Sequence, residues 1–110
     1  MGGEMSTNAE AVTVLITCPI RAGREEQARR EFSEIIGVVV RDEDACHGIW
    51  LHEDPENLQQ LMLIEHWDSK EIFTGAHMQT PHMQAFLERA AEFLAGAPDF
   101  RFWHEIARAT

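Results

Sequence analysis

Residues 12–36 read VTVLITCPIRAGREEQARREFSEII, and the spacing of their apolar side chains changes partway along. From Val12 to Cys18 the run is largely β-branched and has a period of two, which predicts a strand. From Ala28 to Val39 the apolar residues recur three and four positions apart, behind acidic residues in the first turn. This spacing predicts an amphipathic helix directly after the strand.

Two more strand-like runs follow at residues 48–53 and 59–67. The residues between them, from Asp54 to Asn57, are turn formers. We therefore expect these two runs to pair as an antiparallel hairpin.

Two helix-start signals come after the hairpin. Asp68 followed by Glu71 is a capping-box pattern and predicts a short helix. Thr80 before Pro81 is a second start signal, since threonine caps helices and proline tolerates the first helical position. Apolar residues at helical spacing over residues 83–94 predict a longer helix behind it.

A final strand is predicted over residues 100–106, where apolar and polar side chains alternate. The resulting order, β-α-β-β-α(α)-β, is the split βαβ arrangement of ferredoxin-like folds. We predict one α+β domain over residues 11–110, with a four-stranded antiparallel sheet. Residues 1–10 are small and polar without periodicity, and we expect a flexible N-terminal arm.

The register of the predicted hairpin decides which side chains share a face of the sheet. Pairing Glu53 with Gln60 would put aromatic and titratable groups together, as a pocket for a flat, oxygenated ring needs. The residues gathered in this way are Trp50, His52, Glu65 and Trp67. A slip of one residue would scatter them.

Charge and hydropathy exclude several classes of partner. The chain has 9 Lys plus Arg against 19 Asp plus Glu, and its net charge of -10 makes nucleic acid an unfavourable partner. No apolar run approaches the roughly 20 residues that span a bilayer, and no signal pattern opens the sequence. We expect a cytoplasmic protein without a membrane partner.

The two cysteines, Cys18 and Cys46, have no CxxC spacing. Both lie in strand-like segments, and a reducing compartment favours two buried free thiols over a disulfide. A disulfide between Cys18 and Cys46 is the alternative hypothesis.

Four short motifs resemble one known family. They are Ala22–Glu26 at the start of the first helix, Cys46–Gly48 before the second strand, Glu65–Ser69 at the end of the third, and residues 76–86. In their order and spacing they resemble the antibiotic biosynthesis monooxygenase family, and the resemblance covers roughly residues 12–106.

The resemblance implies a homodimer whose two sheets form a dimeric α+β barrel, with a cavity between each sheet and its helices. A sheet that is apolar on both faces also favours a dimer, because its own helices cover only one of them. Active members of the family often oxidise quinols or polycyclic phenols with molecular oxygen and need no flavin, haem or metal. Other members isomerise small signalling molecules or degrade haem, so the resemblance fixes the fold better than the reaction.

We expect no cofactor and no dedicated metal site. Six histidines are many for this length, but no HExxH or Cys/His cluster is present, and His77 and His82 are five positions apart. Haem degradation is disfavoured, because Leu87 and Ile16 stand where haem-degrading relatives place a ligand histidine and an asparagine.

Oxygen chemistry without a cofactor requires a base that removes a phenolic proton, and histidine is the obvious base at neutral pH. The candidate catalytic residues are His77, His82 and Glu65, and the candidate substrate-binding residues are His52, Trp67, Phe86 and Trp50. Each has a structural alternative: the histidines could serve the helix ends, Glu65 could be a hydrogen-bonded brace, and the rings could pack the core or a dimer.

Two functional hypotheses remain open. The first is a cofactor-independent monooxygenase that acts with molecular oxygen on a small quinol or an aromatic polyketide-like phenol. The second is a non-catalytic or isomerase-like module that binds a small metabolite on the same scaffold. An enclosed apolar cavity with one or two bases would favour the first, and an open polar cleft the second.

Overall fold

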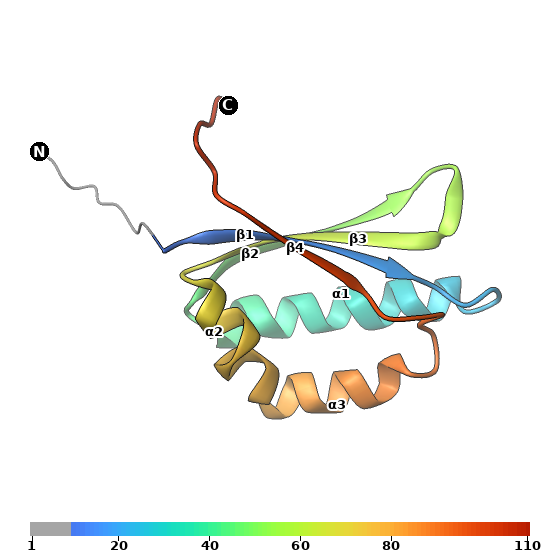
Figure 1. The fold of residues 1–110 in the computed structure, drawn as a ribbon. Helices are drawn as coiled ribbons and strands as arrows, with labels where there is room; N and C mark the ends of the chain where they lie inside the picture. Colours follow the sequence, from blue (N-terminus) through green and yellow to red (C-terminus); the bar gives the residue numbers. More distant parts are fainter. Residues whose placement is uncertain (1–9) are drawn as a thin grey trace, which may run out of the picture.

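Four strands, three α-helices and one short 3₁₀ helix make up residues 10–110, the part of the chain that this computed structural model describes (Figure 1). In chain order they are β1 (Val12–Pro19), α1 (Glu25–Asp42), β2 (Cys46–Asp54), β3 (Asn57–Trp67), α2 (Lys70–Thr74), η1 (Ala76–Gln79), α3 (Pro81–Ala90) and β4 (Asp99–Trp103). This is the predicted order of elements. Of the predicted N-terminal arm, residues 1–9 lie outside the described residues.

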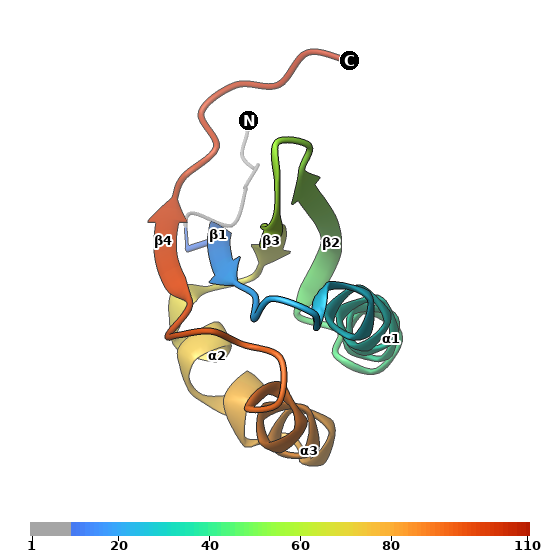
Figure 2. The ribbon, with the colours of Figure 1, turned by 90° about the vertical axis from the view of Figure 1, so that its right-hand side faces the viewer.

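The four strands form one antiparallel sheet in the order β2-β3-β1-β4. The helices lie on one side of it, and the opposite face carries no helix (Figure 2). The predicted ferredoxin-like α+β fold is thereby confirmed, while the dimeric barrel stays a prediction. Of the helices in residues 10–110, none has the length and apolar character that crossing a bilayer requires.

The core lies between the sheet and the helices. Along β1 every second side chain from Val12 to Cys18 is buried, as its period of two predicts. From the helical side Phe32 packs edge-on against Phe86 and Phe93, with ring centroids 5.2 and 5.7 Å apart. Cys18 and Cys46 are free and buried, as expected.

Local capping residues and tertiary packing determine where the helices begin and end. Ser69, not Asp68, caps α2, because its Oγ accepts a hydrogen bond from the Ile72 backbone N–H at 3.1 Å. Thr80 caps α3 as predicted, accepting from the Met83 N–H at 3.3 Å. The predicted long helix ends early, at Ala90, and the chain then turns so that residue 94 bridges to residue 20 beside β1.

The predicted hairpin register is wrong by one residue. Glu53 pairs with Leu61 instead of Gln60, and Ile49 lies opposite Glu65. The pairing shifts between Glu53 and Asp54, next to the tight turn that joins the strands. Asp54 pairs with Asn57 and Glu53 with Leu61, so the irregularity leaves residues 58–60 of β3 between these two pairs. A second shift falls at His47, between Cys46 and Gly48.

The corrected register separates the predicted pocket residues. Trp50 and His52 alternate with Ile49 and Leu51 and share the uncovered face of the sheet with His66. The last strand is also shorter than predicted, since it ends at Trp103.

Candidate functional site

A small cavity lies between the sheet, α1 and α3, and its volume is about 80 Å³. Most of its walls are apolar and include Ile16, Phe32, Leu63, Phe73, Met83 and Phe86. Among the described residues that line it, only Glu65, His77 and Cys18 have ionisable side chains. Because burial raises the pKa of the Cys18 thiol to about 12, the groups that can exchange a proton near neutral pH are Glu65 and His77.

Glu65 is a buried carboxyl group on β3. It faces the helices because it belongs to the alternate positions of that strand whose side chains enter the core, and it is only 5% exposed. The Trp67 Nε1–H donates a hydrogen bond to Glu65 Oε1 over 2.8 Å. Burial raises the pKa of Glu65 to about 7, the hydrogen bond from Trp67 opposes that rise, and the charge of Glu43 adds to it.

His77 lies in η1, where its ring packs against two aromatic rings, and it is 3% exposed. Its ring stacks on Phe73 with centroids 5.3 Å apart and lies 4.4 Å from the Trp67 ring centroid. The His77 Nδ1 lies 3.0 Å from each carboxylate oxygen of Glu43. Burial lowers the pKa of His77, while the hydrogen bond and charge of Glu43 act in the opposite direction.

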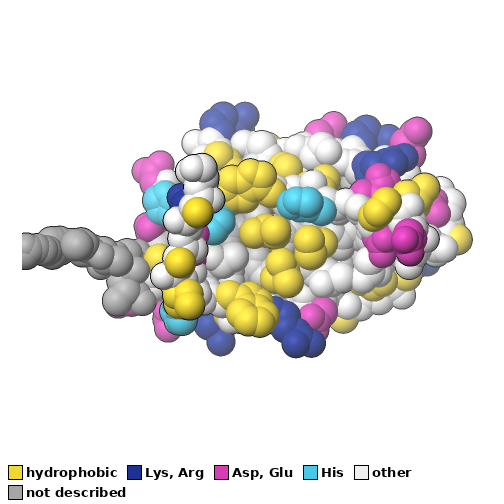
Figure 3. Space-filling model, turned by 90° about the horizontal axis from the view of Figure 1, so that it is seen from above, with side chains coloured by type: hydrophobic (Ala, Val, Ile, Leu, Met, Phe, Trp, Pro, Cys, Tyr) yellow, Lys and Arg dark blue, Asp and Glu magenta, His cyan; other side chains and the backbone are white. Residues whose placement is uncertain are grey.

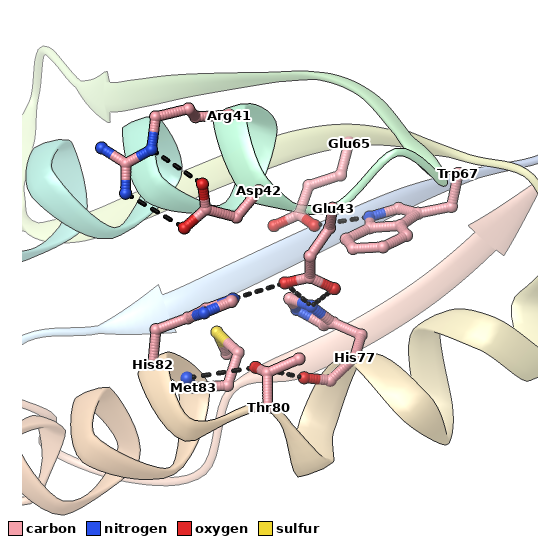
Figure 4. Close-up of polar contacts among 9 residues, drawn as sticks. All are labelled: Arg41, Asp42, Glu43, Glu65, Trp67, His77, Thr80, His82 and Met83. Atoms are coloured by element: carbon pink, nitrogen blue, oxygen red, sulfur yellow. Dashed lines mark hydrogen bonds and ion pairs between the residues drawn. The ribbon is translucent and has the colours of Figure 1, made fainter.

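Glu43 joins two histidines behind the cavity. It follows α1 directly, and its backbone N–H donates to the Val39 carbonyl as part of the end of that helix. Its Oε2 also lies 2.6 Å from His82 Nε2, so one carboxylate contacts both imidazoles (Figure 4). His82 stands in the first turn of α3 and does not line the cavity.

Glu43 was not among the sequence candidates. It lies 34 and 39 residues before its two histidine partners, and no local spacing links them. Its neighbours at residues 41–44 are all charged, which is the usual pattern of a solvated surface. Only the packing of α1 against η1 and α3 reveals the cluster.

The structure brings together part of the predicted site. Glu65, His77 and Phe86 line one cavity, as predicted. Trp67 does not line it but contacts both Glu65 and His77 from behind. His82 reaches the site only through Glu43.

Trp50 and His52 do not reach this cavity, because they lie on the other face of the sheet. Trp50 lines a separate hollow there and meets His66 edge-on, with ring centroids 5.2 Å apart. Figure 3 shows this uncovered face, where hydrophobic side chains gather around a histidine.

The cavity has an open side between α3 and β4. Leu87 and Phe100 both line it and remain 45% and 42% exposed. Met78 and Met83 also line the cavity, and methionine side chains adapt readily to a ligand. Within residues 10–110, no group of three or more His, Cys, Asp or Glu side chains is arranged to hold a metal ion.

A four-stranded antiparallel sheet, helices on one face and an apolar cavity between them define a ferredoxin-like domain with an internal cavity. The chain belongs to the antibiotic biosynthesis monooxygenase family, whose family model matches residues 11–89. Among curated proteins, none matches the chain.

Several solved structures share this fold. PA3566 from Pseudomonas aeruginosa is 21% identical, with a TM-score of 0.79 over 92% of this chain and 99% of that one. A putative antibiotic biosynthesis monooxygenase from Bacteroides thetaiotaomicron is 15% identical, with a TM-score of 0.82 over 94% and 97% of the two chains. Rv0793 from Mycobacterium tuberculosis is 21% identical, with a TM-score of 0.76 over 91% and 99%. At these identities the likeness concerns the fold alone.

Proposed function

We propose that the protein is a cofactor-independent monooxygenase that oxidises a small phenol or quinol with molecular oxygen. The observation that carries this proposal is an apolar cavity in which Glu65 and His77 are the described groups able to exchange a proton near neutral pH. Membership of the antibiotic biosynthesis monooxygenase family supports the same reaction class.

The chemistry of the lining favours an aromatic ligand with hydroxyl groups. The Glu65 carboxylate accepts hydrogen bonds, and so does the ring nitrogen of neutral His77 that does not face Glu43. Two acceptors in an apolar cavity select a ligand that brings donors. The aromatic walls formed by Phe32, Phe73 and Phe86 suit a flat ring.

The cavity volume favours a single ring. A cavity of roughly 150 Å³ is enough to bind benzene, and this one measures about 80 Å³ before any side chain moves. Adjustment of the lining side chains of Met78 and Met83 would admit one ring. A polycyclic substrate would require displacement of the core.

Glu65 is the better proton acceptor of the two groups. A base works best when its pKa lies near the working pH, and that of Glu65 is raised to about 7. Burial has the opposite effect on His77, because it lowers the pKa of the imidazole. We assign proton removal to Glu65 and assign His77 to orienting the ring through a second hydroxyl group.

For a hydroquinone, the reaction balances without a cofactor. Glu65 removes a phenolic proton, and the phenolate passes one electron to O₂. The semiquinone and superoxide radicals combine to form a ring C–O bond, and the peroxide takes a proton back from Glu65. The O–O bond then breaks, and hydroxide leaves with the proton of that ring carbon as water. One oxygen atom stays on the ring as a hydroxyquinone, and the substrate has supplied all four electrons.

The test is oxygen consumption by protein purified without a histidine tag and stripped of metal, with single-ring hydroquinones as substrates. We expect Glu65→Gln to lower the enzymatic rate by about a hundredfold or more, the usual range for a positioned base. Glu53→Gln is the control, because Glu53 is a β2 carboxylate that pairs with Arg29 on the surface.

Two results would contradict the proposal. One is full activity of the Glu65→Gln variant. The other is hydroquinone binding by the wild-type protein with no oxygen consumption above the rate without protein, which would instead support a non-catalytic module that binds a small metabolite.

A further inference from the structure

The carboxylate of Glu43 is the least expected feature of the site. It is mostly buried, with 12% of its side chain exposed, and it meets imidazoles from two other elements. His77 Nδ1 lies 3.0 Å from both of its oxygens, and His82 Nε2 lies 2.6 Å from Oε2. The mechanism proposed above gives Glu43 no role.

These contacts determine which nitrogen of His77 carries the hydrogen. A carboxylate only accepts hydrogen bonds, so the Nδ1 that faces Glu43 must be the donor. A neutral imidazole has one N–H, and its Nε2 is therefore the unprotonated nitrogen. Without a partner at Nδ1, His77 would be free to exchange between its two tautomers.

We propose that Glu43 is a positioning residue, which fixes His77 in the Nδ1–H form and thereby presents Nε2 as the acceptor for a substrate hydroxyl group. This inference rests on the proposed function, since it assigns the orienting role of His77 to a third residue. His82 holds the same carboxylate from the other side, so Glu43 cannot turn away from His77 without losing a 2.6 Å contact.

A purely mechanical role is the competing explanation, because Glu43 also ties α1 to α3. The chain contains a matched comparison for this role. Glu31, also on α1, binds Arg89 on α3 over 2.8 Å, and its side chain is 15% exposed. The Glu31 carboxylate is buried to a similar extent as that of Glu43 and joins the same two helices, but it does not contact His77, and its partner Arg89 is exposed.

The experiment compares Glu43→Gln with Glu31→Gln by ¹⁵N NMR of labelled histidine in the absence of substrate. An amide replaces one carboxylate oxygen by a donating NH₂ group. If its oxygen keeps the position of Oε2, which contacts both imidazoles, the NH₂ takes the position of Oε1 and faces His77 Nδ1, where it favours the tautomer with an unprotonated Nδ1. We expect Glu43→Gln to convert the single Nδ1–H form of His77 into a mixture of tautomers. The pKa of His77 should also fall further, because Glu43 holds it up against burial. Glu31→Gln should change neither property.

Steady-state kinetics with a single-ring hydroquinone provide the second readout. Loss of one orienting hydrogen bond should raise KM by roughly tenfold and change kcat less, because proton removal by Glu65 is intact. Glu43→Asp keeps the charge but is too short to reach both imidazoles. It should shift the tautomers in the same direction by less, which keeps the test available if Glu43→Gln does not fold.

The inference is overturned if His77 keeps one tautomer and an unchanged pKa in the folded Glu43 variants. It is also overturned if Glu31→Gln causes the same changes, since helix attachment would then explain them. Both of these outcomes are read from the NMR spectra in the absence of substrate and do not depend on oxygen consumption. A wild-type protein that shows no turnover would defeat the proposed function, while the tautomer measurement would still decide whether Glu43 positions His77.

Discussion

At the scale of single residues, Glu65 combines two conflicting requirements. Its carboxyl group is buried beside apolar walls, which penalise its charge, yet it must lose a proton in order to act as a base. The hydrogen bond from Trp67 lowers the cost of that charge, although burial is the larger effect. The protein therefore bears a cost in stability to keep this group inside the cavity.

This cost predicts a pH-dependent stability difference. The Glu65 pKa rises from 4.5 to about 7 on folding, so between these values the folded state holds a proton that the unfolded chain releases. Raising the pH through this window lowers the free energy of unfolding, by on the order of 3 kcal/mol in total. Glu65→Gln has no such ionisation, and its stability relative to the wild type should rise by about that amount between pH 4 and pH 8.

Urea unfolding of both proteins at several pH values measures the difference between their free energies of unfolding. Ionisable groups that the two proteins share contribute equally to both values and cancel in this difference. A difference that stays constant with pH would show that Glu65 ionises alike in the folded and unfolded states.

Some of these residue positions could be predicted from the sequence and others could not. Phe86 comes from the helix whose start is marked by Thr80 and Pro81, and His77 comes from the short segment before it. Their approach to Glu65 follows from the fold. Glu43 could not be found in this way, because its partners meet it only through contacts distant in sequence.

At the scale of secondary structure, the buried faces of single elements were predicted correctly, whereas the pairing register of the β2–β3 hairpin was not. The period of two along β1 and the helical period in α1 each identify a buried face directly. In the hairpin the sequence pattern does not distinguish the buried face from the exposed one, since both faces of β2 carry large apolar side chains such as Ile49 and Trp50. An irregularity at the turn then moved Trp50 and His52 to the opposite face from Glu65.

The N-cap of α3 is an element whose loss can be measured. The Thr80 hydroxyl accepts from the Met83 N–H and lies 2.9 Å from the His77 carbonyl, to which it donates. Thr80→Ala removes both bonds, and we expect a loss of about 1 kcal/mol in the free energy of unfolding. Thr80→Ser should retain most of the stability. Equal urea midpoints for the alanine variant and the wild type would contradict this role of the cap.

Leu87 on α3 should control the size of the ligand, because it lines the cavity while its side chain is partly exposed at the open side. Leu87→Ala should raise kcat/KM for a two-ring hydroquinone relative to a single-ring one by about tenfold. The same substitution at Leu58, an exposed residue of β3 outside the cavity, is the control. An unchanged ratio would place the open side of the cavity elsewhere.

At the scale of the whole molecule, one face of the sheet is uncovered (Figures 2 and 3). Side chains that point away from the helices include Leu15, Trp50 and Ile64, and Trp50 is among the exposed large hydrophobic residues. Apolar side chains on a sheet face usually pack against another layer. We propose that a second copy of the chain supplies that layer.

A homodimer formed through this face predicts that Leu15→Lys weakens association, because it places a charge at the centre of the uncovered sheet. Val40→Lys is the control, since Val40 is an exposed residue of α1 on the helical side. Sedimentation at micromolar concentration should show a dimer for the wild type and the control, and dissociation for Leu15→Lys. A stable, folded wild-type monomer would contradict the proposed dimer.

The proposed function depends on the Glu65 carboxylate, which removes the proton that starts oxidation, and the pH dependence of kcat/KM tests this role most directly. Since Glu65 must be ionised, kcat/KM for a single-ring hydroquinone should rise with pH through a pKa of about 7. The same pKa should appear when the Glu65 carboxyl carbon of the free protein is titrated by ¹³C NMR. A profile that rises through a different pKa, or one that persists in Glu65→Gln, would contradict this role of Glu65.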